Sequence, residues 1–110
     1  MKRIITSFGA FRTGDDIADA VSRYALMLAK RHDTDVVDIP FVEEDGTEQR
    51  IELRIGWLVD IGLVADPPER WEMQEPTTVE DLNARIAILE RDHAFSAAWT
   101  RSWSFWEHEI

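Results

Sequence analysis

An alternating pattern of apolar and polar residues in the middle of the chain predicts a β-hairpin. Residues 36–42 and 51–57 are rich in β-branched and aromatic side chains, and an Asp-Gly pair ending at Gly46 lies between them. A three-residue loop with Gly46 in the left-handed conformation pairs Ile39 with Ile51 and keeps the apolar side chains on one face, whereas a two-residue turn would place charges there. The segment therefore predicts two antiparallel strands with one apolar face, which a second layer of structure must cover.

Two further segments have the apolar period of amphipathic helices. In residues 15–32 apolar side chains recur at intervals of four, three and four, and residues 77–93 contain a similar stripe. Thr13 and Thr77 each stand three positions before an acidic residue, which is the form of an N-terminal capping box. We therefore predict helices over these two ranges, the second of them reaching residue 93 or beyond.

The remaining segments are less regular. Residues 3–8 predict a short strand, and glycines bracket a loop over residues 9–14. Residues 57–65 favour a continued strand after a bulge, with a helical turn closed by Gly62 as the alternative. Pro40 lacks an N–H, so its strand should lie at a sheet edge or have a free N–H side at this residue.

This order of elements predicts an α+β fold. The order β-α-β-β-(β)-α separates the helices from a mostly antiparallel sheet, which indicates a two-layer sandwich with both helices on one face. The chain has 110 residues, enough for one hydrophobic core, so residues 1–110 are expected to form a single α+β domain. Residues 94–110 form an aromatic-rich C-terminal segment whose spacing fits either a helical stripe or an alternating strand.

No motif in the sequence predicts catalysis, a metal or a cofactor. Gly9 and Gly14 have the glycine spacing of a phosphate-binding loop, but Asp15 replaces the lysine that would hold the phosphates. Glu90 and His93 have the helical spacing of a di-iron ligand pair, but the sequence lacks the second pair that such a centre needs. The chain contains no cysteine, and no serine or threonine stands in a nucleophile motif. We therefore predict no catalytic residue, no metal site and no cofactor.

The charge of the chain is strongly negative and unevenly distributed. The formal net charge is −10, which opposes direct binding to nucleic acid. Residues 33–81 contain 15 acidic and three basic side chains. Such acids can serve solubility and protect strand edges, or they can form a surface for a basic protein partner. The candidate partner surface consists of Asp35, Glu43, Glu44, Asp45, Glu48 and Glu52.

Tryptophan is unusually frequent, with five residues in the chain. Three of them fall between positions 99 and 106, and large aromatic side chains are common at interface hot spots. A small sheet covered by two helices has little room for these side chains, and a large exposed apolar patch is rare on monomers. We therefore predict a homodimer whose twofold interface contains Phe95, Trp99, Trp103, Phe105 and Trp106.

The first residues and the hydropathy give the expected location. Acidic residues at positions 15, 16 and 19 follow a short basic start, where a signal peptide would need apolar residues, and no window approaches the length of a membrane span. We expect a cytoplasmic protein without membrane contact. Our first hypothesis is a non-enzymatic protein-interaction or regulatory module that forms a homodimer. The alternatives are an acidic nucleic-acid mimic that inhibits a basic protein, as a bacterial antitoxin or a phage-encoded antagonist would, and a small-molecule enzyme of unknown class.

Overall fold

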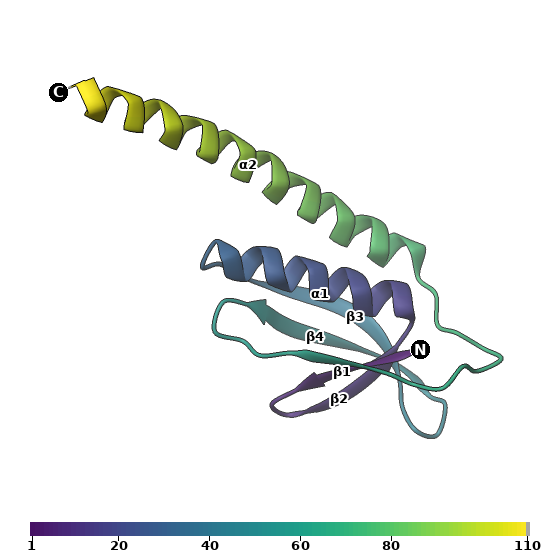
Figure 1. Cartoon of the computed structure of the whole chain (residues 1–110). Helices are drawn as coiled ribbons and strands as arrows, with labels where there is room; N and C mark the ends of the chain where they lie inside the picture. Colours follow the sequence, from purple (N-terminus) through teal and green to yellow (C-terminus); the bar gives the residue numbers. More distant parts are fainter. Residues whose placement is uncertain (110) are drawn as a thin grey trace.

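The computed structural model describes the backbone of residues 1–109 and the side chains of residues 1–92. In this part of the chain, one antiparallel sheet has the strand order β4-β3-β2-β1-β5, and two helices accompany it (Figure 1). The elements in chain order are β1 (Lys2–Thr6), β2 (Gly9–Thr13), α1 (Asp15–Lys30), β3 (Thr34–Val42), β4 (Glu48–Gly56), β5 (Gly62–Ala65) and α2 (Pro76–Glu109). The α+β class predicted from the sequence is confirmed.

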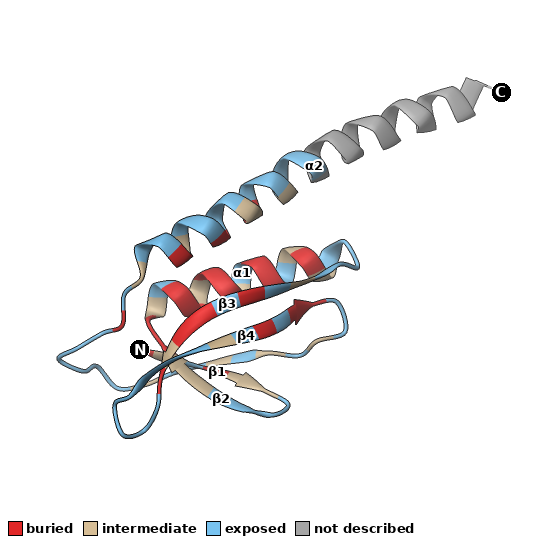
Figure 2. Ribbon diagram, turned by 180° about the vertical axis from the view of Figure 1, so that it is seen from behind, coloured by how far each residue is buried: buried red, intermediate tan, exposed pale blue. Residues whose placement is uncertain are grey.

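Both helices lie on the same side of the sheet (Figures 1 and 2). α1 packs on the sheet, and α2 packs against α1, to which a hydrogen bond of 2.9 Å from Arg23 to Asn83 ties it. α2 also reaches β3, because Nη1 of Arg85 lies 3.0 Å from Oδ2 of Asp35 and 3.3 Å from the carbonyl oxygen of Val36. The predicted arrangement of the helices on one face of the sheet is therefore correct.

The core lies between the sheet and the helices, where Figure 2 shows the buried residues in red. α1 buries Ile17, Val21, Tyr24 and Leu28, the positions whose spacing predicted a helix. The sheet and α2 add Ile4, Val37, Ile39, Leu53, Ile55, Leu82 and Ile86.

The predicted register of the central hairpin is confirmed. β3 pairs with β4 so that Val37 faces Leu53 and Ile39 faces Ile51, which puts these side chains on the helix-covered side. Gly46 has a φ of +86°, the left-handed conformation that the three-residue loop requires. The turn chemistry and the apolar alternation thus agree on a single register.

Pro40 lies within β3, and its missing N–H faces away from β4. The carbonyl oxygen of Pro40 accepts a hydrogen bond of 2.8 Å from Oγ1 of Thr13, so this carbonyl points towards β2. The backbone nitrogen of a strand residue points to the same side as its carbonyl, and the nitrogen of Pro40 therefore also points towards β2. β2 and β3 pair through Arg12 and Val42 alone. The proline therefore removes no hydrogen bond from the β3–β4 ladder, as expected of a strand with a free N–H side.

The second strand was expected as a loop, and this expectation is wrong. Residues 9–13 form β2, which pairs with β1 after a two-residue turn. The glycine at each end of the segment suggested a loop, but Phe11 faces Ile4 across the ladder and packs edge-on against Phe41, with ring centroids 5.2 Å apart. Burial of an aromatic side chain against the core favours the extended backbone here despite the glycines.

The strand expected over residues 57–65 is shorter in the structure. β4 ends at Gly56, the chain turns at Trp57 and Leu58, and β5 begins at Gly62. Gly56 has a φ of +115°, and a Cβ atom there would overlap the carbonyl oxygen of Asp33. The glycine therefore ends the strand with a tight turn, and the chain crosses to the opposite edge of the sheet.

Neither predicted capping box forms. Gly14 occupies the N-cap position of α1, because the hydroxyl of Thr13 is buried and bonded to β3. α2 begins one residue earlier than expected, with Pro76 in its first turn and a hydrogen bond from the hydroxyl of Thr78 to the carboxylate of Glu75. At α2 a local contact with Glu75 thus replaces the predicted capping box.

Candidate functional site

Four residues of the predicted acidic surface gather at the tip of the β3–β4 hairpin. Glu43, Glu44 and Asp45 lie in the loop and Glu48 begins β4, and all four are exposed (Figure 2). Asp45 shapes the loop, since its Oδ1 accepts a hydrogen bond of 2.9 Å from the N–H of Thr47. Hydrogen bonds from Thr47 hold the pKa of Asp45 below its usual value, so this carboxylate stays charged in the turn.

A depression of about 380 Å³ separates this hairpin tip from the linker that follows β5. The hairpin contributes Val42, Glu43, Glu44 and Glu48 to its lining, β2 contributes Arg12, and the linker contributes Glu69 and Trp71. Trp71 is 49% exposed, so part of its surface is available for contact. Carboxylates beside an exposed indole are the groups that bind an ammonium or guanidinium ion in proteins.

Ion pairs with the sheet hold the linker in place. Asp66 accepts hydrogen bonds of 2.9 Å from Nε of Arg3 and from Nε of Arg12. Burial alone would raise the pKa of Asp66, but these two hydrogen bonds outweigh it and lower the pKa below its usual value. Arg12 also forms an ion pair with Glu69, which brings the linker alongside the hairpin. Trp71 therefore stands on a fixed segment.

The end of the linker is fixed against the start of α1. Oε1 of Glu72 accepts a hydrogen bond of 2.8 Å from the N–H of Asp15, which gives α1 the cap that its own sequence does not supply. Met73 is buried next to Gly14, where a Cβ atom would overlap the carbonyl oxygen of Met73. The glycine that resembled part of a phosphate-binding loop thus makes room for the linker.

The carboxylates of the depression differ in their partners. Glu69 is paired with Arg12, whereas Glu43, Glu44 and Glu48 form no ion pair with any side chain of residues 1–92. These three side chains are therefore available to a cation from outside the chain. Their charges also lie close to one another, which raises the local negative potential.

Asp35 lies far from this site. It stands near the start of β3, where its Oδ2 accepts hydrogen bonds of 2.5 Å from the Tyr24 hydroxyl and 3.0 Å from Arg85. Burial and the hydrogen bond to Asp35 raise the pKa of Tyr24 to about 12. Burial would raise the pKa of Asp35 as well, but the hydrogen bonds from Tyr24 and Val36 and the charge of Arg85 lower it. Asp35 thus links α1, β3 and α2.

Glu52 is also separate from the hairpin tip. It lies in the middle of β4, exposed, between Arg50 and Arg54 on the face of the sheet that the helices leave free. The structure therefore brings together four of the six acidic residues singled out from the sequence.

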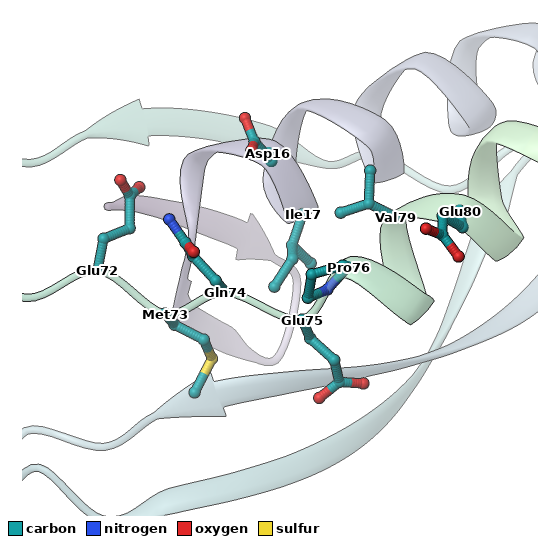
Figure 3. A pocket seen from close by; sticks show the side chains of 9 residues that line it. All are labelled: Asp16, Ile17, Glu72, Met73, Gln74, Glu75, Pro76, Val79 and Glu80. Carbon is teal, nitrogen blue, oxygen red and sulfur yellow. The ribbon is translucent and has the colours of Figure 1, made fainter.

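A second depression, of about 310 Å³, lies between the first turns of α1 and α2 (Figure 3). Ile17, Met73 and Val79 provide its apolar lining, and carboxylates such as Asp16 and Glu80 surround them. The phosphate-binding geometry considered from the sequence does not occur here, because carboxylates surround the start of α1 and Glu72 already bonds to its first N–H.

The predicted aromatic interface lies outside the described side chains. The backbone of α2 continues to Glu109, which decides between helix and strand for this segment in favour of the helix. Nothing is described of the side chains of Phe95, Trp99, Trp103, Phe105 and Trp106. The homodimer through these residues stays a prediction.

Two further structural findings concern the described part of the chain. Within it, no three side chains of the histidine, aspartate or glutamate type come together as metal ligands. None of the helices there combines the length and the apolar character needed to cross a lipid bilayer.

Comparison with known proteins yields no relative: no family model, no curated protein and no solved structure matches the chain. Glu69 and Trp71 were missed in the sequence because they stand in an irregular linker. A tryptophan in a polar, proline-containing segment was the available signal.

Proposed function

We propose that the chain is a protein-interaction module that binds a basic segment of another protein at the hairpin tip. A lysine or arginine side chain of the partner enters the depression between the hairpin and the linker, lies against Trp71, and pairs with Glu43, Glu44 or Glu48. The observation that supports this proposal is the exposed indole beside three carboxylates without partners in the described part of the chain. Cation–π contact and charge pairing together give more specificity than either alone.

The alternative of an extended nucleic-acid mimic has less support from the charge pattern. A row that imitates phosphates should contain acids without cations between them. Along β4, however, Arg50 and Arg54 alternate with Glu48 and Glu52. Three carboxylates that form no ion pair in the described part of the chain, Glu43, Glu44 and Glu48, instead gather around one depression, which favours recognition of one or two basic side chains.

Calorimetric titration with a synthetic lysine-glycine peptide tests the proposal, with a glutamate-glycine peptide of equal length as the negative probe. We expect saturable binding of the lysine peptide that weakens when sodium chloride is raised from about 50 mM to about 500 mM, since salt screens such pairs. Trp71→Ala and Glu44→Gln should each weaken binding by about fivefold.

The matched controls are Trp57→Ala and Glu90→Gln, which remove an exposed tryptophan and an exposed acid elsewhere. Both should bind the lysine peptide as the unmodified chain does. Equal weakening by the controls, or binding that is indifferent to salt, would show that net charge or an apolar surface accounts for the interaction and would overturn the proposal.

A further inference from the structure

β4 is an edge strand whose outer side has no partner in the described part of the chain. It pairs with β3 alone, at the end of the sheet order. Along an antiparallel strand, the N–H and C=O groups of one residue point to the same side, and successive residues alternate. The residues of β4 whose backbone groups do not point to β3 therefore have N–H and C=O groups free at the outer edge.

The hydrogen bonds of β3 settle this alternation. The carbonyl oxygens of Val36 and Pro40 accept hydrogen bonds from Arg85 and Thr13, so these residues are turned away from β4. The odd-numbered residues of β3 and β4 are therefore the ones whose backbone groups bond across the ladder. Just beyond the strands the same alternation continues, since the N–H of Trp57 donates to the carbonyl oxygen of Asp33 at 2.9 Å. The backbone groups of the even-numbered β4 residues consequently point outward.

The open part of this edge has definite ends. At one end lies the hairpin loop before Glu48. At the other, the N–H of Val59 donates to the carbonyl oxygen of Gly56 at 3.2 Å and occupies the outer side of that residue. The edge is thus open from Glu48 to Arg54, and Ile51 is its central residue.

The charges along the open edge are complementary to themselves. Glu48, Arg50, Glu52 and Arg54 are all exposed and lie on one face. When a second copy is placed antiparallel with Ile51 on the twofold axis, each Glu48 faces Arg54 of the second copy and each Arg50 faces Glu52. A shift to the neighbouring register places either Arg50 opposite Arg50 or Glu52 opposite Glu52, and like charges directly opposite are destabilising.

We propose that β4 pairs with β4 of a second copy in this register and joins the two sheets into one across the twofold axis. In this arrangement the outward groups of Arg50 and Glu52 form hydrogen-bonded pairs. Ile51, which is half-buried, forms the non-hydrogen-bonded pair on the axis and meets its own copy there. Charged edges usually discourage strand addition, and this edge accepts a copy of itself because all four of its charges face opposite charges in this register.

Arg50 has partners within its own chain. Its Nε lies 2.8 Å from Oδ1 of Asp38, and its Nη1 lies 2.8 Å from Oε2 of Glu75. These contacts hold the side chain on the sheet, so the pairs of Glu48 with Arg54 are the better target for variants. Neither Glu48 nor Arg54 forms an ion pair with another side chain among residues 1–92.

Disulfide trapping tests the register directly, because the chain has no cysteine of its own. In Ile51→Cys the two cysteines would lie opposite each other on adjacent strands, with their Cα atoms about 4.5 Å apart, which is within the range of a disulfide. In the control Gln49→Cys they would be separated by four residues, roughly 14 Å, and could not join. We expect cross-linking of Ile51→Cys to be at least about tenfold faster than that of Gln49→Cys.

A charge swap tests the interface without adding a thiol. Glu48→Arg and Arg54→Glu should each raise the dissociation constant of the dimer in sedimentation equilibrium by about tenfold, because each opposes like charges. The double variant Glu48→Arg/Arg54→Glu restores opposite charges and should restore the dimer. Glu52→Pro should also weaken the dimer, since it removes an outward N–H that β3 does not use.

Circular dichroism establishes that each variant is folded before its association is measured. A chain that remains monomeric at high concentration overturns the proposal, and so does a double variant that stays as weak as the single ones. A dimer that is insensitive to the β4 variants and lost in Trp103→Ala assigns the interface to the aromatic segment and likewise overturns it.

Discussion

At the scale of single residues, Asp35 shows how a surface acid can have an internal role. Its position among 15 acids in residues 33–81 suggested a partner-binding residue. In the structure its carboxylate accepts hydrogen bonds from Tyr24 and Arg85, which stand on two different helices. The hydrogen bond from Arg85 spans 50 residues of sequence, so no local pattern could reveal it.

The proton of Tyr24 provides a test of this network. Tyr24 is the single tyrosine of the chain, and we expect its phenol to ionise near pH 12 in the folded protein and near pH 10.0 in the unfolded chain. Because the folded state holds the proton more tightly, this stabilisation is complete below pH 10 and is lost as the pH rises from 10 to about 12. Ultraviolet absorbance of the phenolate measures both values.

Two variants test what raises the pKa of Tyr24 and how this pKa affects the stability of the fold. Tyr24→Phe should remove the loss of stability between pH 10 and 12, and Asp35→Asn should move the pKa of Tyr24 towards 10.0. Phenolate that appears at the same pH with and without denaturant would contradict the hydrogen bond between Tyr24 and Asp35.

At the scale of elements, the start of α1 depends on a residue far along the chain. The sequence placed the cap at Thr13, but the buried hydroxyl of that residue serves β3, and Glu72 caps the helix instead. Elements whose signals are local were predicted well: the stripe of α1 and the register of Ile39 with Ile51 follow from period and turn type. The cap of α1 depends on Glu72, and the extended backbone of β2 is favoured by the contact of Phe11 with Phe41, so neither could be predicted from the local sequence.

The cap from Glu72 has a measurable stability. We expect Glu72→Ala to lower the free energy of unfolding by about 1 kcal/mol, because it leaves an N–H of the first turn of α1 without an acceptor. Glu72→Gln keeps an acceptor oxygen and should cost less. Gln74→Ala, at an exposed position of the same linker, is the control in urea unfolding. If Gln74→Ala lowers the free energy of unfolding as much as Glu72→Ala does, the result contradicts the cap.

At the scale of the whole molecule, the sheet consists of two parts that share one core. β1, β2 and β5 form one part and β3 and β4 the other, and Arg12 with Val42 is the single described pair between them. Packing of both parts against α1, together with the contact of Phe11 with Phe41, holds them together. The sequence predicted a sheet with its helices on one face, but it could not predict this division, because β2 was expected as a loop.

A shared core implies that the two parts unfold together. We expect one urea transition, with far-ultraviolet circular dichroism and tryptophan fluorescence giving the same midpoint. Phe11→Ala should lower the free energy of unfolding by about 2 kcal/mol, since this half-buried ring bridges the two parts. Phe8→Ala removes a neighbouring ring that is 68% exposed and should have an effect below about 0.5 kcal/mol. Separate midpoints for the two probes would show that the parts are independent.

The place of β1 between β2 and β5 has a consequence for synthesis on the ribosome. β2 follows β1 immediately, but the strand that covers the other edge of β1 begins at Gly62. A nascent chain therefore carries β1 with one open edge while α1, β3 and β4 are still being added, and such unpaired edges promote aggregation. The time during which this edge needs protection ends when translation has delivered the four residues of β5.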